Sequence, residues 1–136
     1  MRASGTFTVL EFTPAPVPES DIKTAAGVGV ATMHKEFGGE IEGRSDTLFT
    51  AAYDQAAGVG TYLAMESFTG TLHGAEGTFN FAHSATTLGS GRDGEYFVIV
   101  PGSGTAALTG ITGTGGIVVD EDGTHRIHLD YELPAE

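Results

Sequence analysis

The chain has 136 residues, no cysteine, and a formal net charge of -12 from six Lys and Arg against eighteen Asp and Glu. The negative charge disfavours nucleic acid and anionic membrane surfaces as partners, and the lack of cysteine excludes disulfides and thiolate metal sites. The length suits one domain over residues 1–136. No long apolar run and no signal-peptide-like segment occurs, so we expect a cytoplasmic protein.

Twenty-one glycines are spread along the chain, and a glycine inside a helix costs about 1 kcal/mol, so strands are expected. Turn residues separate eight extended segments. These segments cover residues 6–12, 27–37, 40–53, 59–69, 78–88, 95–100, 105–119 and 125–133. An antiparallel sheet of about eight strands can close and leave room for side chains or one small ligand. The expected fold is all-β, a single-domain eight-stranded antiparallel β-barrel.

Residues 13–26 form the one obvious interruption after the first segment. Pro14, Pro16 and Pro18 lack the backbone donors that a β-ladder needs. The sequence therefore predicts a long proline-rich loop, which is either a passive connector or a flap over the barrel mouth.

Alternation along the segments assigns side chains to the barrel interior. In the last segment, Ile127 and Leu129 define the buried face. Lys35 shares a face with Phe37, and we expect its amine to lie near a rim, because lysine usually extends toward solvent. The polar and aromatic residues placed inside are Tyr53, Tyr62, Glu66, Phe79, Phe81, His83, His125 and Tyr131.

An apolar interior with a few polar groups is typical of a ligand site. A carboxylate among aromatic rings is expected to have a raised pKa and a buried histidine a lowered pKa, so both could exchange protons near neutrality. We predict Glu66 and His83 as the catalytic pair. The alternative is that these buried groups only hydrogen-bond one another and fix the strand register. The predicted ligand-binding residues are Tyr53, Tyr62, Phe79, Phe81, His125 and Tyr131.

Other motifs give weaker signals. Residues 89–94, GSGRDG, match the dinucleotide fingerprint, but no helix follows, so we interpret them as a hairpin loop. Glu66, His83 and His125 have the composition of an iron or zinc site, but no spacing requires one, and we expect neither a metal nor another cofactor. Residues 101–116 contain six glycines and no basic residue, which favours a barrel corner over a phosphate loop.

Several motifs beyond residue 27 are shared with a known family. They are FGGEIEG at 37–43; Glu66 with TGTL at 69–72, Gly74, Gly77 and Phe79; His83; PGSGT at 101–105 with Leu108, Gly110, Gly113 and Gly115; and LDY at 129–131. By these residues the chain resembles the bacterial family catalogued as domain of unknown function 3224. The resemblance implies a small barrel similar to plant allene oxide cyclase. One departure is Phe97, because family members often carry a tryptophan just before the PGSGT segment.

Related barrels guide a reactive molecule to one product without a cofactor. Our leading hypothesis is that the barrel binds a small apolar organic molecule inside and promotes a cofactor-free cyclisation, isomerisation or elimination. One alternative is a non-catalytic, lipocalin-like carrier or sensor. Another is a solid-core barrel acting through protein contacts. The sequence does not decide whether the protein is an enzyme, and it allows a homo-oligomer without fixing the number of subunits.

Overall fold

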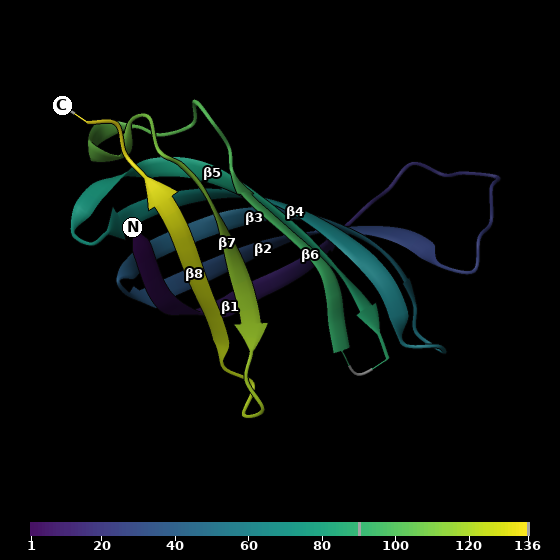
Figure 1. Cartoon of the computed structure of the whole chain (residues 1–136). Coiled ribbons are helices and arrows are strands. Elements are labelled where there is room, and N and C mark those ends of the chain that lie inside the picture. Colours follow the sequence, from purple (N-terminus) through teal and green to yellow (C-terminus); the bar gives the residue numbers. More distant parts are fainter. Residues whose placement is uncertain (90, 136) are drawn as a thin grey trace.

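The computed structural model describes residues 1–89 and 91–135, most of which lie in strands of one sheet (Figure 1). The strands are β1 (Arg2–Ala15), β2 (Gly27–Gly39), β3 (Ile41–Asp54), β4 (Val59–Leu72), β5 (Ala75–Leu88), β6 (Gly91–Ile99), β7 (Thr112–Val119) and β8 (His125–Glu132). A short 3-10 helix, η1 (Ala106–Leu108), lies between β6 and β7. No helix within the described residues is long and apolar enough to cross a bilayer.

Each strand pairs antiparallel with the next one along the chain, and β8 pairs with β1 to close the barrel. The closing ladder joins Arg2–Phe7 to residues 125–130. Pairing each strand with its neighbour in the sequence is the simplest order for an antiparallel sheet. The β1–β2 and β6–β7 connections, 16–26 and 100–111, are long, and the other connections are short turns. The predicted all-β, eight-stranded antiparallel barrel is confirmed.

The boundaries of several predicted segments are wrong, and the first, 6–12, is longer at both ends. β1 continues to Ala15, and Pro14 lies within it opposite Ala31. This proline is tolerated because β8 pairs only with the first residues of β1, so no second neighbour needs its missing N–H. The loop is therefore residues 16–26, and Figure 1 shows it projecting away from the barrel.

The predicted strand over residues 105–119 begins only at Thr112, because η1 and its flanking turns occupy the first part. These turns close one end of the barrel. Leu108 and Ile111 are fully buried there, and a Cβ on Gly104 would collide with the Leu108 backbone carbonyl. This glycine therefore allows the close approach that seats Leu108, in agreement with a glycine-rich barrel corner.

The predicted hairpin loop at residues 89–94 is shorter than expected. β6 already begins at Gly91, so Arg92 and Asp93 are strand residues that pair with β5. Ser90, inside the GSGRDG motif, lies outside the described residues.

Aromatic and aliphatic side chains fill the barrel next to the closed end. Phe68 packs on Phe37 and Phe79, with ring centroids 5.4 Å and 5.1 Å away, and all three rings are buried. The cluster continues through Phe7, Ile41, Leu72, Ile99 and Leu129. This half of the interior is therefore a close-packed hydrophobic core.

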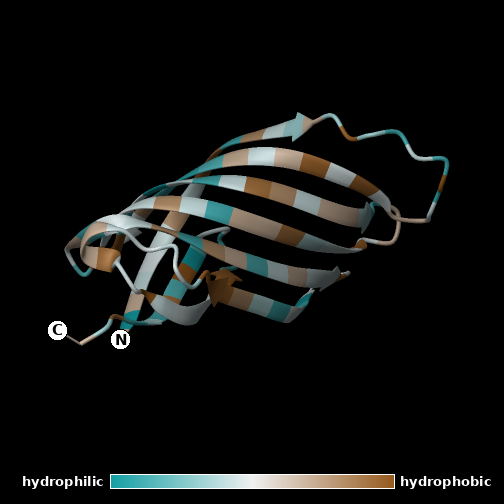
Figure 2. Ribbon diagram, turned by 90° about the horizontal axis from the view of Figure 1, so that it is seen from above, coloured by the Kyte–Doolittle hydropathy of each residue, from teal (hydrophilic) through white to brown (hydrophobic). Residues whose placement is uncertain are grey.

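The opposite end, which we call the mouth, is open. Inward-facing residues become more exposed along β3 toward it, from buried Thr47 through half-buried Phe49 to exposed Tyr53. A bulge between Val9 and Glu11 in β1 brings Phe12 onto the same side, where its ring meets Phe49 edge-on. Figure 2 shows hydrophobic and pale residues alternating along these long strands.

The barrel wall is weakest between β6 and β7, where the register contains the single pair Ile99 and Gly113. Toward the mouth these strands diverge (Figure 1). A side chain spans the gap, because Glu95 Oε1 accepts a hydrogen bond from the Ile117 backbone N–H at 3.1 Å. A crevice of about 550 Å³ lies here, lined by Arg92, Glu95 and residues 117–119.

Candidate functional site

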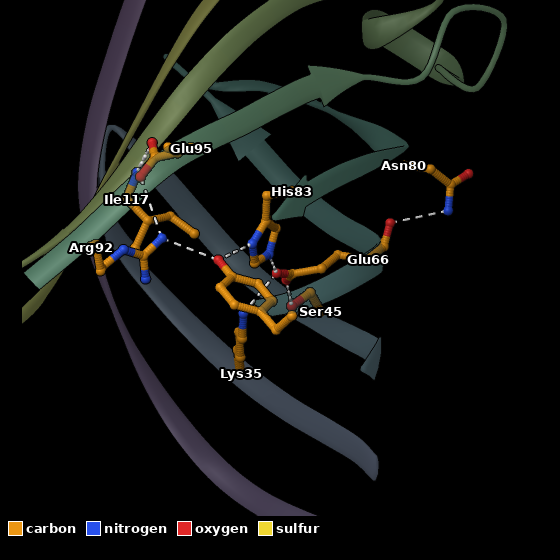
Figure 3. Close-up of polar contacts among 9 residues, drawn as sticks. Lys35, Ser45, Glu66, Asn80, His83, Arg92, Glu95 and Ile117 are labelled. Atoms are coloured by element: carbon orange, nitrogen blue, oxygen red, sulfur yellow. Dashed lines mark hydrogen bonds and ion pairs between the residues drawn. The ribbon is translucent and has the colours of Figure 1, made fainter. Parts of the chain in front are cut away.

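A carboxylate with no solvent exposure lies between the packed core and the mouth. Glu66 Oε2 is 2.6 Å from Lys35 Nζ and 2.5 Å from His83 Nε2, and Oε1 accepts a hydrogen bond from the Ser45 hydroxyl at 2.7 Å. Figure 3 shows these three side chains converging on Glu66. The exposed fraction is 4% for Lys35, 5% for His83 and 0% for Glu66, so the cluster is buried within the barrel.

Strand register brings this cluster together from four neighbouring strands. Lys35 on β2 lies opposite Ser45 on β3, and Thr47, two residues further along β3, lies opposite Glu66 on β4. His83 on β5 lies opposite Ala64, whose small side chain leaves the imidazole free to reach diagonally to Glu66. Residues two apart share one face, so the site follows from alternation and register.

The predicted raised pKa of Glu66 is wrong. Burial does raise it, but hydrogen bonding by His83 and the positive charge of Lys35 outweigh burial and lower the pKa from 4.5 to about 2. Glu66 is therefore an ionised acceptor at neutral pH. It orients its partners and does not itself pick up a proton.

Lys35 is also buried rather than near a rim. Its ammonium lies 4.8 Å from the centroid of the Phe7 ring, a cation–π contact, in addition to its ion pair with Glu66. The inward face predicted for this residue is correct, but its expected extension toward solvent is wrong. A buried ammonium is tolerated here because the carboxylate pairs with it.

A chain of hydrogen bonds leads from Glu66 to the mouth. His83 Nδ1 lies 2.8 Å from the Tyr62 hydroxyl, which also accepts a hydrogen bond from Arg92 Nη2 at 3.1 Å. Arg92 in turn pairs with Glu95 at 3.3 Å. Since an ionised carboxylate only accepts, His83 Nε2 carries a proton toward Glu66, and in neutral His83 the Nδ1 atom accepts from Tyr62.

Tyr62 is the half-buried member of this chain that faces the mouth. Burial raises the pKa of its phenol, and the hydrogen bond from Arg92 only partly opposes that shift. Tyr62 is therefore a neutral hydroxyl at physiological pH. Its ring stacks on Phe49 with centroids 5.4 Å apart and an interplanar angle of 18°.

Two adjoining hollows share Phe49 and Tyr53, and one of them also includes Tyr62. One of about 270 Å³ is lined by residues that include Phe49, Tyr53 and Tyr62, and the other, of about 370 Å³, is lined by Phe12, Phe49 and Tyr53 among others. The exposed ring of Tyr53 is shared by both. The smaller hollow therefore places a largely apolar surface next to Tyr62, at the mouth rather than deep in the barrel.

The other predicted ligand-binding residues lie elsewhere. Phe79 is packed in the apolar core, and Phe81 stacks against His83 with centroids 5.9 Å apart. Tyr131 is buried near the closed end, where its hydroxyl is 2.8 Å from His73 Nδ1. His125 is half-buried beside Phe7. Only Tyr53 and Tyr62 of the predicted set line the hollows at the mouth.

Four residues of this region, Ser45, Thr47, Phe49 and Arg92, were not among the predicted site residues. Ser45, Thr47 and Phe49 alternate in phase with Tyr53 on β3, so the same face assignment would have placed them inside. Thr47 Oγ1 is buried and has no hydrogen-bond partner, which leaves an unused polar atom next to Glu66. The fourth, Arg92, was hidden within the supposed hairpin loop at residues 89–94.

The histidines and acidic residues give no metal-ion geometry. Across residues 1–89 and 91–135, no three His, Asp or Glu side chains gather closely enough to hold a metal ion. His125 contacts Phe7, whereas Lys35, Ser45 and His83 are the side chains that bind the Glu66 carboxylate.

Comparison with known proteins supports the fold and the family. The family model described as "Protein of unknown function (DUF3224)" matches residues 3–131. The crystal structure of a protein of unknown function from this family, from Shewanella oneidensis MR-1, is similar with a TM-score of 0.85 and 27% sequence identity, covering 99% of this chain and 98% of that one. No curated protein matches the chain. The match over almost the whole length shows that the chain belongs to the DUF3224 family.

Proposed function

We propose that the barrel binds a small, largely apolar organic molecule in its mouth and exchanges a proton with it through Tyr62 and His83. The observation that carries the proposal is the continuous hydrogen-bonded chain from buried Glu66 to the Tyr62 hydroxyl, which ends beside the aromatic hollows. An apolar hollow with one oriented polar group is the usual make-up of a small-molecule site.

The chemistry follows from the state of each group. Tyr62, as a neutral phenol, donates its hydroxyl proton to an atom of the bound molecule. This step starts with His83 protonated at both ring nitrogens, so that Nδ1 donates to the Tyr62 oxygen and the phenol proton is free for the bound molecule. His83 then transfers its Nδ1 proton to the phenolate and becomes neutral. Glu66 stays ionised, stabilises the imidazolium and fixes the ring orientation through Nε2. The phenolate form of Tyr62, regenerated as neutral His83 takes back the proton, then removes a proton from a different atom of the bound molecule. The protein returns to its starting state, and the net reaction is a cofactor-free isomerisation or cyclisation.

Under this proposal, Glu66 is a positioning residue and the acid–base group is His83 acting through Tyr62. Arg92 donates to the same hydroxyl oxygen, and its charge stabilises the phenolate as the proton leaves. The unpartnered Thr47 hydroxyl next to Glu66 gives a second polar anchor for a ligand atom or a water deeper in the barrel.

A non-catalytic carrier is the second candidate. It is favoured by the saturation of Glu66, whose carboxylate is already bound by Lys35, Ser45 and His83. Such a protein would use Tyr62 only as a hydrogen-bond donor. Mass spectrometry of molecules released from the purified protein separates the two candidates: a carrier returns its ligand unchanged, whereas the catalyst converts it and His83→Gln does not.

Binding itself is tested with the neutral fluorescent probe N-phenyl-1-naphthylamine. We expect a saturable rise in fluorescence, and at least tenfold weaker binding for Phe49→Ala, because removing one aromatic wall costs more than about 1.4 kcal/mol of contact. Val118→Ala, which alters an exposed apolar residue that lines neither of the two hollows, should bind as the wild type does. Equal affinity of the Phe49→Ala variant and the wild type would show that the site is not at the mouth.

A further inference from the structure

The outer surface of the five strands β2–β6 carries two adjacent rows of uncharged residues. Cross-strand pairing makes each row continuous from one strand to the next. One row is Thr32, Leu48, Met65, Ala82 and Val98, and the other is Val30, Thr50, Leu63, Ser84 and Tyr96. We call these ten residues the uncharged face.

Large apolar side chains in this face are open to solvent. The exposed fraction is 66% for Leu48, 58% for Leu63, 47% for Met65 and 58% for Tyr96. They lie close together, because Leu48 is directly opposite Met65 and the next row begins two residues along each strand. A contiguous exposed apolar patch on a protein surface usually marks a contact with another molecule.

Charged residues begin at the borders of the uncharged face. The next row toward the closed end starts with His34 and Asp46, whose Nδ1 and Oδ1 atoms are hydrogen-bonded at 2.6 Å. Toward the mouth, Asp93 lies opposite Thr86, one row beyond Ser84. In a chain with a net charge of -12, five strands therefore share a charge-free centre.

The geometry points to a second copy of this chain as the molecule that covers the uncharged face. Two strongly acidic copies repel each other wherever their charges meet, but here they can pack without burying a charge or placing like charges together. An anionic membrane is disfavoured by the same net charge. A basic protein would be attracted to the acidic residues outside the face rather than to its neutral centre.

The dimensions of the uncharged face suit a sheet-on-sheet contact. Five strands at a spacing of about 4.8 Å and two rows about 7 Å apart give an area of about 350 Å². A stable interface covers about 800 Å² of each partner, of which the rim is polar. The neighbouring residues Val28, Ala52, Thr61 and Thr86, which are also uncharged, extend the contact toward that area, and two sheets pack face to face in this way in β-sandwiches.

The outer surface of β1, β7 and β8, by contrast, carries charged side chains. On β1 and β8, Arg2 is bonded to Asp130, and Arg126 on β8 pairs with Asp120. Val118 on β7, with an exposed fraction of 56%, lies opposite Arg126. Val118 is thus as exposed as Leu63 but has a charged neighbour, which makes it a matched control.

Light scattering coupled to size-exclusion chromatography tests the proposal at tens of micromolar protein. The wild type should have twice the 14.0 kDa mass of the chain. Leu63→Glu should dissociate with at least a tenfold higher dimer Kd, because two carboxylates would be buried in a symmetric contact, and Val118→Glu should remain dimeric. A monomeric wild type, or a Leu63→Glu variant as dimeric as the wild type, would overturn the proposal.

A second measurement does not depend on the folding of a charged variant. The chain has no cysteine, so Leu63→Cys and Val118→Cys each carry one spin label. Intermolecular dipolar coupling is expected for the label at position 63 and not for the label at position 118. Coupling at neither position, or at position 118 alone, contradicts the proposed contact. The association does not rest on the ligand-binding proposal, since the uncharged face lies on the outer surface of the barrel.

Discussion

The two halves of the barrel interior are built differently from the same strands. β4 places Phe68 in the closed half and Glu66 two residues nearer the mouth, and β5 repeats the contrast with Phe79 and His83. All four side chains are buried. The closed half is filled with rings and aliphatic chains, whereas the next layer holds an ion pair and a hydrogen-bonded histidine.

This difference shows which half serves stability. Burying apolar side chains is the main favourable term in folding, whereas a buried ion pair is often no more stabilising than hydrophobic residues of the same volume. We therefore expect a methionine and a leucine in place of Lys35 and Glu66 to stabilise the barrel at least as well as the ion pair does. Its connection to Tyr62 at the mouth is the reason we assign it to function.

The largest effect is expected from truncation in the closed half. Phe68→Ala should lower the free energy of unfolding by about 3–5 kcal/mol, because it opens a cavity among Phe37, Phe79 and their neighbours. Urea denaturation measures this change. Folded Phe68→Ala should still bind N-phenyl-1-naphthylamine, and loss of binding by the folded variant would show that the two halves are not separable.

Removing only one partner of the Lys35–Glu66 ion pair should lower the free energy of unfolding about as much as Phe68→Ala does. Lys35→Met leaves Glu66 without its buried counter-charge and should destabilise the protein by about 3–5 kcal/mol. The double variant Lys35→Met/Glu66→Leu should recover most of that loss in urea denaturation. A double variant as unstable as the single one would mean that the pair is itself a major source of stability.

Acid should weaken the polar layer selectively. The pKa of Glu66 is lowered from 4.5 to about 2 in the folded protein by His83 and Lys35, which outweigh burial. A lowered folded-state pKa contributes stability that is fully present above about pH 4.5 and is lost as the pH falls toward 2. The double variant Lys35→Met/Glu66→Leu should lose less stability over this range. Parallel pH curves for both proteins would contradict the assignment.

The smallest effect on stability is expected at the mouth. Tyr62→Phe removes hydrogen bonds with His83 and Arg92 but keeps the ring against Phe49, so it should cost about 1 kcal/mol or less. Thermal unfolding measures that loss. The same variant should abolish conversion of any ligand that the wild type transforms, and retained conversion would remove Tyr62 from the proton path.

The sequence predicts much of this architecture because alternation is local. The inward positions of Ile127 and Leu129 and of Glu66 and His83 follow from single strands. Burial of the Lys35 ammonium does not follow from a single strand, because it depends on a carboxylate 31 residues away and two strands across the sheet. The same holds for the lowered pKa of Glu66, which reflects His83 on β5 and Lys35 on β2 outweighing burial.

The alternation of residues along single strands also did not predict which end of the barrel is open. Tyr53 and Phe81 both alternate inward, but one ends exposed at the rim and the other lies in the packed interior. That outcome depends on how far each strand extends past its neighbours and on the turns around Leu108 that close the opposite end. Sequence alone gives the facing of a residue but not its depth along the barrel axis.

The link between the mouth and the buried cluster is tested most directly by nitrogen-15 NMR of the His83 ring. During titration with N-phenyl-1-naphthylamine, the Nδ1 resonance should shift in step with probe binding, because Tyr62 lies between the hollow and Nδ1. In Tyr62→Phe, which keeps the aromatic wall, the shift should largely vanish while the probe still binds. Saturable binding that leaves both His83 nitrogens of the wild type unshifted would contradict the account.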